Sequence, residues 1–246
     1  MLKIDDSIRR KYIPSHVWTQ LSTIHVSEVK TWIYFLTFFL LDALCIIPVV
    51  GDTFSKGYFI AGIIPITLIN IWAVAILFRN VYSTQMEMLY FVLANSTVLA
   101  FCYFLIAQKI VYINGRVESR AFFIISLLFY IGWIIYFTQY IFKKYANMKW
   151  KFGQKNLLLD LLRIILLLLP SNGYNFYHFY VKGNPFELYI TSFIYLSLGI
   201  LPIYLAILFI HRILFIRANP RLFRFYEPSK KEVKQAEAKG KKIEVG

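Results

Sequence analysis

Long apolar runs separated by short polar segments are the main feature of this chain of 246 residues. A helix that crosses the hydrocarbon core of a bilayer needs about 20 mostly apolar residues. Five runs reach this length, and a sixth has only 14 residues. In chain order the runs are Thr31–Val50, Tyr58–Phe78, Met88–Ala107, Ala121–Phe142, the short Asn156–Leu169, and Leu188–Ile210. The pattern predicts an all-α fold, a polytopic membrane helix bundle.

The distribution of Lys and Arg between the runs predicts how the helices are oriented. If all six runs cross, alternate segments place 21 basic residues on one side and five on the other, with Arg163 inside a helix. Basic residues are enriched in short cytoplasmic segments. If the short run Asn156–Leu169 did not cross, the ten basic residues after Phe209 would lie outside. We therefore expect six transmembrane helices with both termini cytoplasmic, in a plasma or inner membrane rather than an organelle.

Polar segments flank the predicted helices. Residues 1–30 show no signal-peptide pattern, so we expect a cytoplasmic N-terminal segment followed by an uncleaved signal anchor. One face of a short helix in this segment carries the apolar residues Val17, Trp18, Leu21 and Ile24. This amphipathic helix lies either at the membrane interface or beneath the bundle. Residues 31–216 are predicted to form the six-helix transmembrane domain. Residues 217–246 are predicted to form a basic cytoplasmic tail, either a short helix or a frayed segment near anionic lipid.

Composition agrees with a membrane location. Hydrophobic residues make up 59% of the chain and charged residues 16%, whereas soluble domains average roughly 45–50% apolar and about 25% charged. The formal net charge of +14 is typical of topology signals and of contact with anionic lipid headgroups. No base-stacking or groove-reading motif accompanies it, so we expect membrane lipids and partner subunits, and no nucleic acid, as binding partners. Cys45 and Cys102 fall inside apolar runs and are expected to be buried free thiols.

Few ionisable side chains lie within the runs, and each is a functional hypothesis because charge at membrane depth is costly. Counted at about 1.5 Å per residue from the cytoplasmic helix ends, five polar residues come to similar depths: Asp42, Asn70, Asn95, Asp160 and Arg163. We expect them to point into the bundle and contact one another, with Arg163 between the two acidic residues. This intramembrane polar layer is either a transport or proton site centred on Asp42, or a charge-balanced cluster that fixes helix order. Lys109 falls in the segment Gln108–Arg120, which is predicted to lie outside.

Two of the runs share a proline pattern. The spacing Tyr58-x-x-x-Gly62-Ile-Ile-Pro65 recurs as Tyr195-x-x-x-Gly199-Ile-Leu-Pro202. Proline kinks a helix because it lacks an amide donor and clashes with the preceding turn. Pro65 and Pro202 are therefore predicted helix kinks in two helices that run in the same direction. Chance similarity in an apolar sequence is one explanation, and paired kinks that shape a cavity are the other.

Motifs of known catalytic chemistry are absent from the sequence. It contains no Walker A, G-x-G-x-x-G, H-E-x-x-H, G-x-S-x-G or C-x-x-C pattern. The four histidines lie on both predicted sides of the membrane without metal-site spacing: His16, His25, His178 and His211. We therefore expect no enzymatic activity, no cofactor and no metal site.

These patterns favour a non-enzymatic integral membrane protein, an anchoring or accessory subunit of a larger membrane assembly. The alternative is a small-solute or ion transporter or channel that uses the polar layer around Asp42, Asp160 and Arg163. A closed apolar bundle with polar residues only at mid-depth would favour the subunit. A continuous polar path would favour transport.

Overall fold

Helices account for all the regular structure of the described residues. The computed structural model describes every residue except 1–2, 5–11, 52, 147–186, 224 and 229–246. Within that part, five helical segments are long and apolar enough to span a bilayer: Val26–Val50, Lys56–Phe78, Gln85–Asn114, Ala121–Ala146 and Leu188–Ala218. The predicted all-helical class is confirmed, and the five segments are those of a multi-pass membrane protein. The sixth predicted run, Asn156–Leu169, lies outside the described residues.

Several spans are built from more than one helix. The first contains η3 (Val26–Glu28), α2 (Val29–Ile33), the π-helical η4 (Tyr34–Ile46) and α3 (Ile47–Val50). The second is α4 (Lys56–Phe78), the third is α5 (Gln85–Lys109) with η5 (Ile110–Asn114), and the fourth is α6 (Ala121–Ala146). The last consists of α8 (Glu187–Leu198) and α9 (Ile200–Ala218). Before the first span lie the short helices α1 (Ser15–Trp18) and η2 (Thr19–Leu21).

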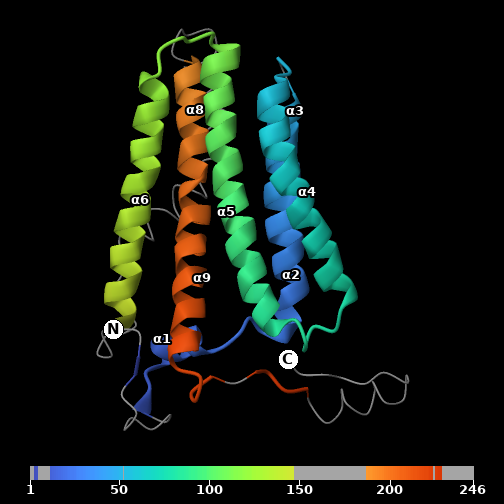
Figure 1. The fold of residues 1–246 in the computed structure, drawn as a ribbon, viewed down its shortest axis with the longest axis vertical. Coiled ribbons are helices and arrows are strands. Elements are labelled where there is room, and N and C mark those ends of the chain that lie inside the picture. Colours follow the sequence, from blue (N-terminus) through green and yellow to red (C-terminus); the bar gives the residue numbers. More distant parts are fainter. Residues whose placement is uncertain (1–2, 5–11, 52, 147–186, 224, 229–246) are drawn as a thin grey trace.

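The spans run side by side along the long axis of the molecule (Figure 1). We call the end at which α1 lies the α1 end, and the opposite end, where the first span finishes, the α3 end. The first span runs from the α1 end to the α3 end, α4 returns, and α5 rises again. Helix α6 then descends to the α1 end, and α8 followed by α9 also descends to the α1 end.

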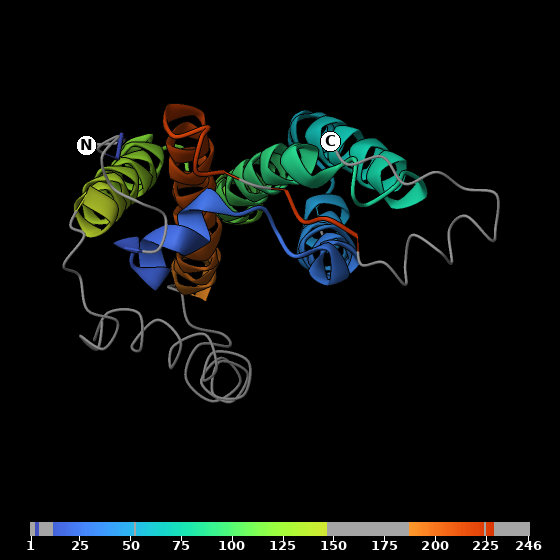
Figure 2. The same cartoon turned by 90° about the horizontal axis from the view of Figure 1, so that it is seen from below.

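Helix α5 occupies the centre of the bundle. It packs against η4, α4, α8 and α9, and the view along the bundle places it between α4 on one side and α6 on the other (Figure 2). Of the most apolar stretch of Gln85–Asn114, 56% is buried within the protein, compared with 17% for Ala121–Ala146. Helix α6 is therefore peripheral and presents most of its apolar surface outward.

Two main clusters of buried side chains surround α5. One joins the first span, α4, α5 and α9, and includes Leu41, Ile66 and Phe91. The other joins α5, α6, α8 and α9 around Tyr130. A third cluster at the α1 end packs Val17 and Leu21 against α9 and the segment that follows it. The apolar face of the N-terminal segment thus lies beneath the bundle, which is one of the two placements that its sequence pattern allows.

The two predicted kink prolines occupy different positions. Pro65 lies inside α4, which continues past it as one helix. Pro202 lies in the first turn of α9, just after the helix break at Gly199. Proline is tolerated in the first turn of a helix, where its missing amide hydrogen has no partner to lose.

The absence of a side chain at Gly199 allows a close approach between helices. A Cβ atom there would overlap the Tyr130 hydroxyl and lie 2.8 Å from Tyr130 Cζ, whereas a Cβ at Gly132 of α6 would meet nothing within 4 Å. Since Tyr130 is buried, its ring has little space into which to move. The packing of α6 against the α8–α9 junction therefore depends on glycine at this position.

We predict that Gly199→Ala destabilises the protein by about 1–3 kcal/mol, the usual cost of overpacking a core. Unfolding in mild detergent can be followed with a thiol-reactive dye, because Cys45 and Cys102 are both buried in the folded state. Gly132→Ala is the matched control, and it should leave the midpoint unchanged or slightly raised. Equal midpoints for Gly199→Ala and the wild type would contradict this account of the junction.

Candidate functional site

The intramembrane site is centred on a hydrogen bond between Asp42 of η4 and Asn70 of α4. The Asn70 amide nitrogen donates to the Asp42 carboxylate at 2.8 Å and to the Ile66 carbonyl, one turn earlier in α4, at 3.1 Å. Both side chains are half-buried, at the boundary between the packed and the outward-facing surfaces of their helices. We call Asp42 and Asn70 the polar pair. The sequence places them at similar depths, and the structure brings them into contact.

A second polar contact, between η4 and α5, is buried more completely within the protein. The Asn95 amide nitrogen donates to the Thr37 hydroxyl at 2.8 Å, and both side chains are fully buried. Thr37 precedes Asp42 by five residues. Because hydrogen bonds in a π-helix join residues five apart, the two side chains lie one turn from each other along η4. Helix η4 therefore presents polar groups to α4 and to α5.

Two atoms beside this contact lack hydrogen-bond partners among the described residues. They are the Asn95 side-chain oxygen and the hydroxyl of the neighbouring Ser96. Leaving a buried polar group unsatisfied costs about 1–3 kcal/mol. The interior near Thr37 thus has spare hydrogen-bonding capacity, which the apolar side chains around it do not fill.

The other two members of the predicted layer, Asp160 and Arg163, lie outside the described residues. The expected position of Arg163 between two carboxylates therefore stays a prediction. Of the five residues in the predicted layer, the structure brings Asp42 and Asn70 into contact, and it joins Asn95 of α5 to η4, the helix of Asp42, through Thr37.

The predicted end of the third span before the outer segment Gln108–Arg120 is wrong, as the position of Lys109 shows. This residue is the last of α5, the helix continues as η5 to Asn114, and the Lys109 side chain is only 2% exposed. Its ammonium group donates to three carbonyls at the end of the first span: those of Pro48 at 2.9 Å, Val49 at 3.0 Å and Gly51 at 2.7 Å. The last carbonyls of a helix have no partner within the helix, and a cation there is favourable. Lys109 thus satisfies the C-terminus of α3.

Two of these residues were missed by reasoning from sequence. Thr37 gives no signal in the sequence, because its alignment with Asp42 depends on π-helical geometry. Lys109 does have a signal: the sequence returns to apolar residues at Ile110–Ile113, which indicates that the helix continues past it. Two consecutive polar residues, Gln108 and Lys109, follow the predicted run Met88–Ala107, but they do not end the helix.

At the α1 end, Gln85, the first residue of α5, hydrogen-bonds to the segments before the first span and after α9. Its side-chain amide pairs with the backbone of Tyr226, donating at 2.9 Å and accepting at 2.8 Å, and it also accepts from the Thr23 hydroxyl at 2.8 Å. Arg212 of α9 donates to the carbonyls of Ser22 and Thr23 at 2.8 and 3.2 Å. The segments before the first span and after α9 are therefore both fastened to the bundle at this end.

No known family model, curated protein or solved structure matches this chain. Among the described residues, no three His, Cys, Asp or Glu side chains lie close enough together to hold a metal ion. The described residues of the site offer hydrogen-bonding groups and one carboxyl group, through the polar pair and the Thr37–Asn95 contact.

We predict that Lys109→Met destabilises the protein by about 1.5–3 kcal/mol, the range for hydrogen bonds to a charged group. The reason is that three helix-end carbonyls lose their donor together. Thermal unfolding with the thiol-reactive dye measures the change, and Lys56→Met is the control because Lys56 is an exposed lysine at the same end of the bundle. If both variants have the same midpoint of thermal unfolding, the role assigned to the buried ammonium group is wrong.

Proposed function

We propose that this chain is an anchoring or accessory subunit of a larger membrane assembly, without enzymatic activity, and that the polar pair contacts a helix of a partner subunit. The observation that carries the proposal is the half-buried Asp42 carboxylate, for which the described residues supply one donor, the neutral Asn70 amide. A carboxylate can accept several hydrogen bonds. In hydrocarbon, a carboxylate with a single neutral donor favours binding of a further donor or a cation.

The surroundings of the polar pair support access by another helix. Exposed side chains lie next to the polar pair or about one turn away from it on η4 and α4: Phe39, Thr67, Ile71 and Val74. A helix that packs on this face would cover apolar surface and bring a donor within reach of Asp42. Association of helices in lipid relies on such packing and interhelical hydrogen bonds, because lipid tails are as apolar as the helices themselves.

A transporter is the second candidate. The buried and unbonded oxygens of Asn95 and Ser96 favour it, since polar atoms with spare capacity can accept hydrogen bonds from water or a solute. Against it, the groove between α5, α6 and α9 has a mostly apolar lining that includes neither member of the polar pair. The polar pair therefore supports the subunit more strongly than a conduit.

We also propose six crossings with both termini in the cytoplasm. Helix α6 ends at the α1 end and α8 begins at the α3 end (Figure 1), and the run Asn156–Leu169 lies between these two helices in the sequence. Eight described Lys and Arg residues belong to the α1 end and four to the α3 end. This bias favours a cytoplasmic α1 end.

Labelling of single introduced cysteines with a membrane-impermeant thiol reagent tests this topology. We predict that Gly57→Cys, at the α3 end, reacts on intact cells, and that Glu227→Cys, which follows α9, reacts only after the membrane is permeabilised. Both positions are exposed, whereas the native Cys45 and Cys102 are buried. The wild type is the background control, and the reverse labelling pattern would contradict the proposed orientation.

We predict that Asp42→Leu reduces recovery of a stoichiometric partner about tenfold when the protein is purified from its native membrane in mild detergent. Loss of one charged hydrogen bond is worth about 1.5–3 kcal/mol, and about 1.4 kcal/mol is a factor of ten in affinity. Quantitative mass spectrometry of the purified complex measures the recovery. Asp42→Asn should give a smaller loss, because the amide keeps the shape and one acceptor.

Gln139→Leu is the control for this experiment, because Gln139 is an exposed polar residue of α6 and lies away from the polar pair. It should leave partner recovery unchanged. Solute or ion flux in liposomes that contain this chain alone, abolished by Asp42→Asn and retained by Gln139→Leu, would overturn the subunit in favour of the transporter.

A further inference from the structure

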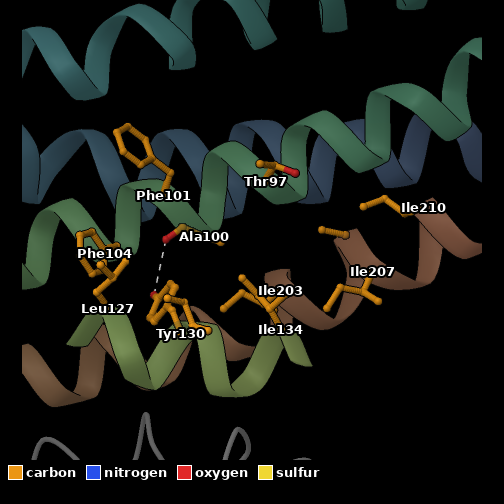
Figure 3. A pocket seen from close by; sticks show the side chains of 12 residues that line it. Thr97, Ala100, Phe101, Phe104, Leu127, Tyr130, Ile134, Ile203, Ile207 and Ile210 are labelled. Atoms are coloured by element: carbon orange, nitrogen blue, oxygen red, sulfur yellow. Dashed lines mark hydrogen bonds between the residues drawn. The ribbon is translucent and has the colours of Figure 1, made fainter. Parts of the chain in front are cut away.

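An apolar groove of ≈ 480 Å³ lies between α5, α6 and α9. Figure 3 shows side chains of the three helices around it, among them Phe104 of α5, Tyr130 and Ile134 of α6, and Ile207 and Ile210 of α9. Ile134 and Ile210 are exposed at its edge, so the groove opens sideways to the hydrocarbon of the bilayer. It is a separate feature from the polar pair, which lies on η4 and α4.

The polar groups of the groove are already bonded. The Tyr130 hydroxyl donates to the Ala100 carbonyl at 3.5 Å, and the Thr97 hydroxyl donates to the Leu93 carbonyl at 2.9 Å. Both bonds leave the remaining lining apolar, and neither hydroxyl needs water. A hydrocarbon chain therefore suits the groove better than a polar solute.

A cation lies beyond the groove, at the α1 end, on the faces of α5 and α9 that line it. Arg217 lies seven residues beyond Ile210 on α9, and Tyr90 lies seven residues before Thr97 on α5. Seven residues are two helical turns, about 10 Å along the same face. There the Arg217 guanidinium donates to the Tyr90 hydroxyl at 2.7 Å and lies 5.8 Å from the centre of its ring. Two of the three helices that form the groove, α5 and α9, thus meet at an exposed arginine at the α1 end.

Two kinds of occupant are apolar enough for this lining, a helix of a partner subunit and a single acyl chain. The exposed cation two turns beyond the lining favours the acyl chain, because a phospholipid joins an apolar chain directly to an anionic group. An acyl chain with a negatively charged group at its end matches both the lining and Arg217.

We propose that this groove binds one acyl chain of an anionic phospholipid whose phosphate is held by Arg217 at the α1 end. The acyl chain contributes burial of its methylene groups against α5, α6 and α9. The guanidinium contributes charge-assisted hydrogen bonds to the phosphate oxygens, for which its planar geometry is well suited. Tyr90 of α5 positions the guanidinium by accepting its hydrogen bond. This site goes beyond the proposed subunit role and does not depend on it.

The test compares two lipids with identical acyl chains on the purified, delipidated protein in mild detergent. Dioleoylphosphatidylglycerol is the anionic probe and dioleoylphosphatidylcholine is the zwitterionic probe. Native mass spectrometry should show at least tenfold tighter binding of the anionic lipid to the wild type. Arg217→Gln should remove this preference, and Arg217→Lys should retain part of it because the charge remains.

Two further variants separate the site from general effects. Lys143→Gln removes a basic residue at the same end, on the face of α6 opposite the groove-lining Ile134, and should keep the full preference. Ala206→Trp fills the groove and should weaken binding of both lipids, whereas Ala61→Trp, at an exposed position of α4, should weaken neither. Equal binding of the two lipids to the wild type, or equal losses in Arg217→Gln and Lys143→Gln, would overturn the proposal. Unchanged binding in Ala206→Trp would overturn it as well.

Discussion

Polar contacts made by α5 hold the bundle together. Each described helix that packs against α5 forms at least one polar contact with it. The contacts join it to η4 through Asn95, to α4 through Glu87, to α3 through Lys109, to α6 through Gln108, to α8 through the Ala107 carbonyl and to α9 through Tyr90. In lipid, apolar helices gain little from burying their surfaces against each other, so interhelical hydrogen bonds of about 0.6–2 kcal/mol each decide which faces meet. The central place of α5 follows from these contacts as much as from its buried apolar residues.

At the ends of the bundle, backbone groups need hydrogen-bond partners that the helices themselves do not supply. At the α3 end, one lysine satisfies three carbonyls of the first span. At the α1 end, Arg212 and Gln85 bond to the backbone of segments that lie outside the spans. Both devices place long polar side chains where a helix leaves the hydrocarbon, and both join segments far apart in the sequence. They fix the positions of the connecting segments relative to α5.

The fold class could be predicted from the sequence because hydrocarbon permits few alternatives to long apolar helices. The predicted run Leu188–Ile210 lies within the described span Leu188–Ala218, and Tyr58–Phe78 differs from α4 by two residues at its start. The neighbours of each helix could not be predicted, because spans that are apolar on every side carry no pattern that selects a face.

Of the site, Asp42 and Asn70 could be identified since polar residues at equal depth are rare. Thr37 could not, because the π-helical geometry that aligns it with Asp42 has no signature in the sequence. The prediction for Lys109 was wrong because two polar residues, Gln108 and Lys109, interrupt the apolar run at a point where the helix continues.

The polar pair and the groove lie on different sides of α5, as the positions of α4 and α6 show (Figure 2). A partner helix at Asp42 and a phospholipid at Arg217 would therefore not compete for the same surface. Helix α5 nevertheless contributes to both regions, with Asn95 facing η4 and Thr97 and Ala100 lining the groove. Any coupling between the two would have to pass through a shift of this helix, which its contacts with six neighbours oppose. The arrangement thus separates the surface of the proposed partner helix from that of the proposed phospholipid, with α5 between them.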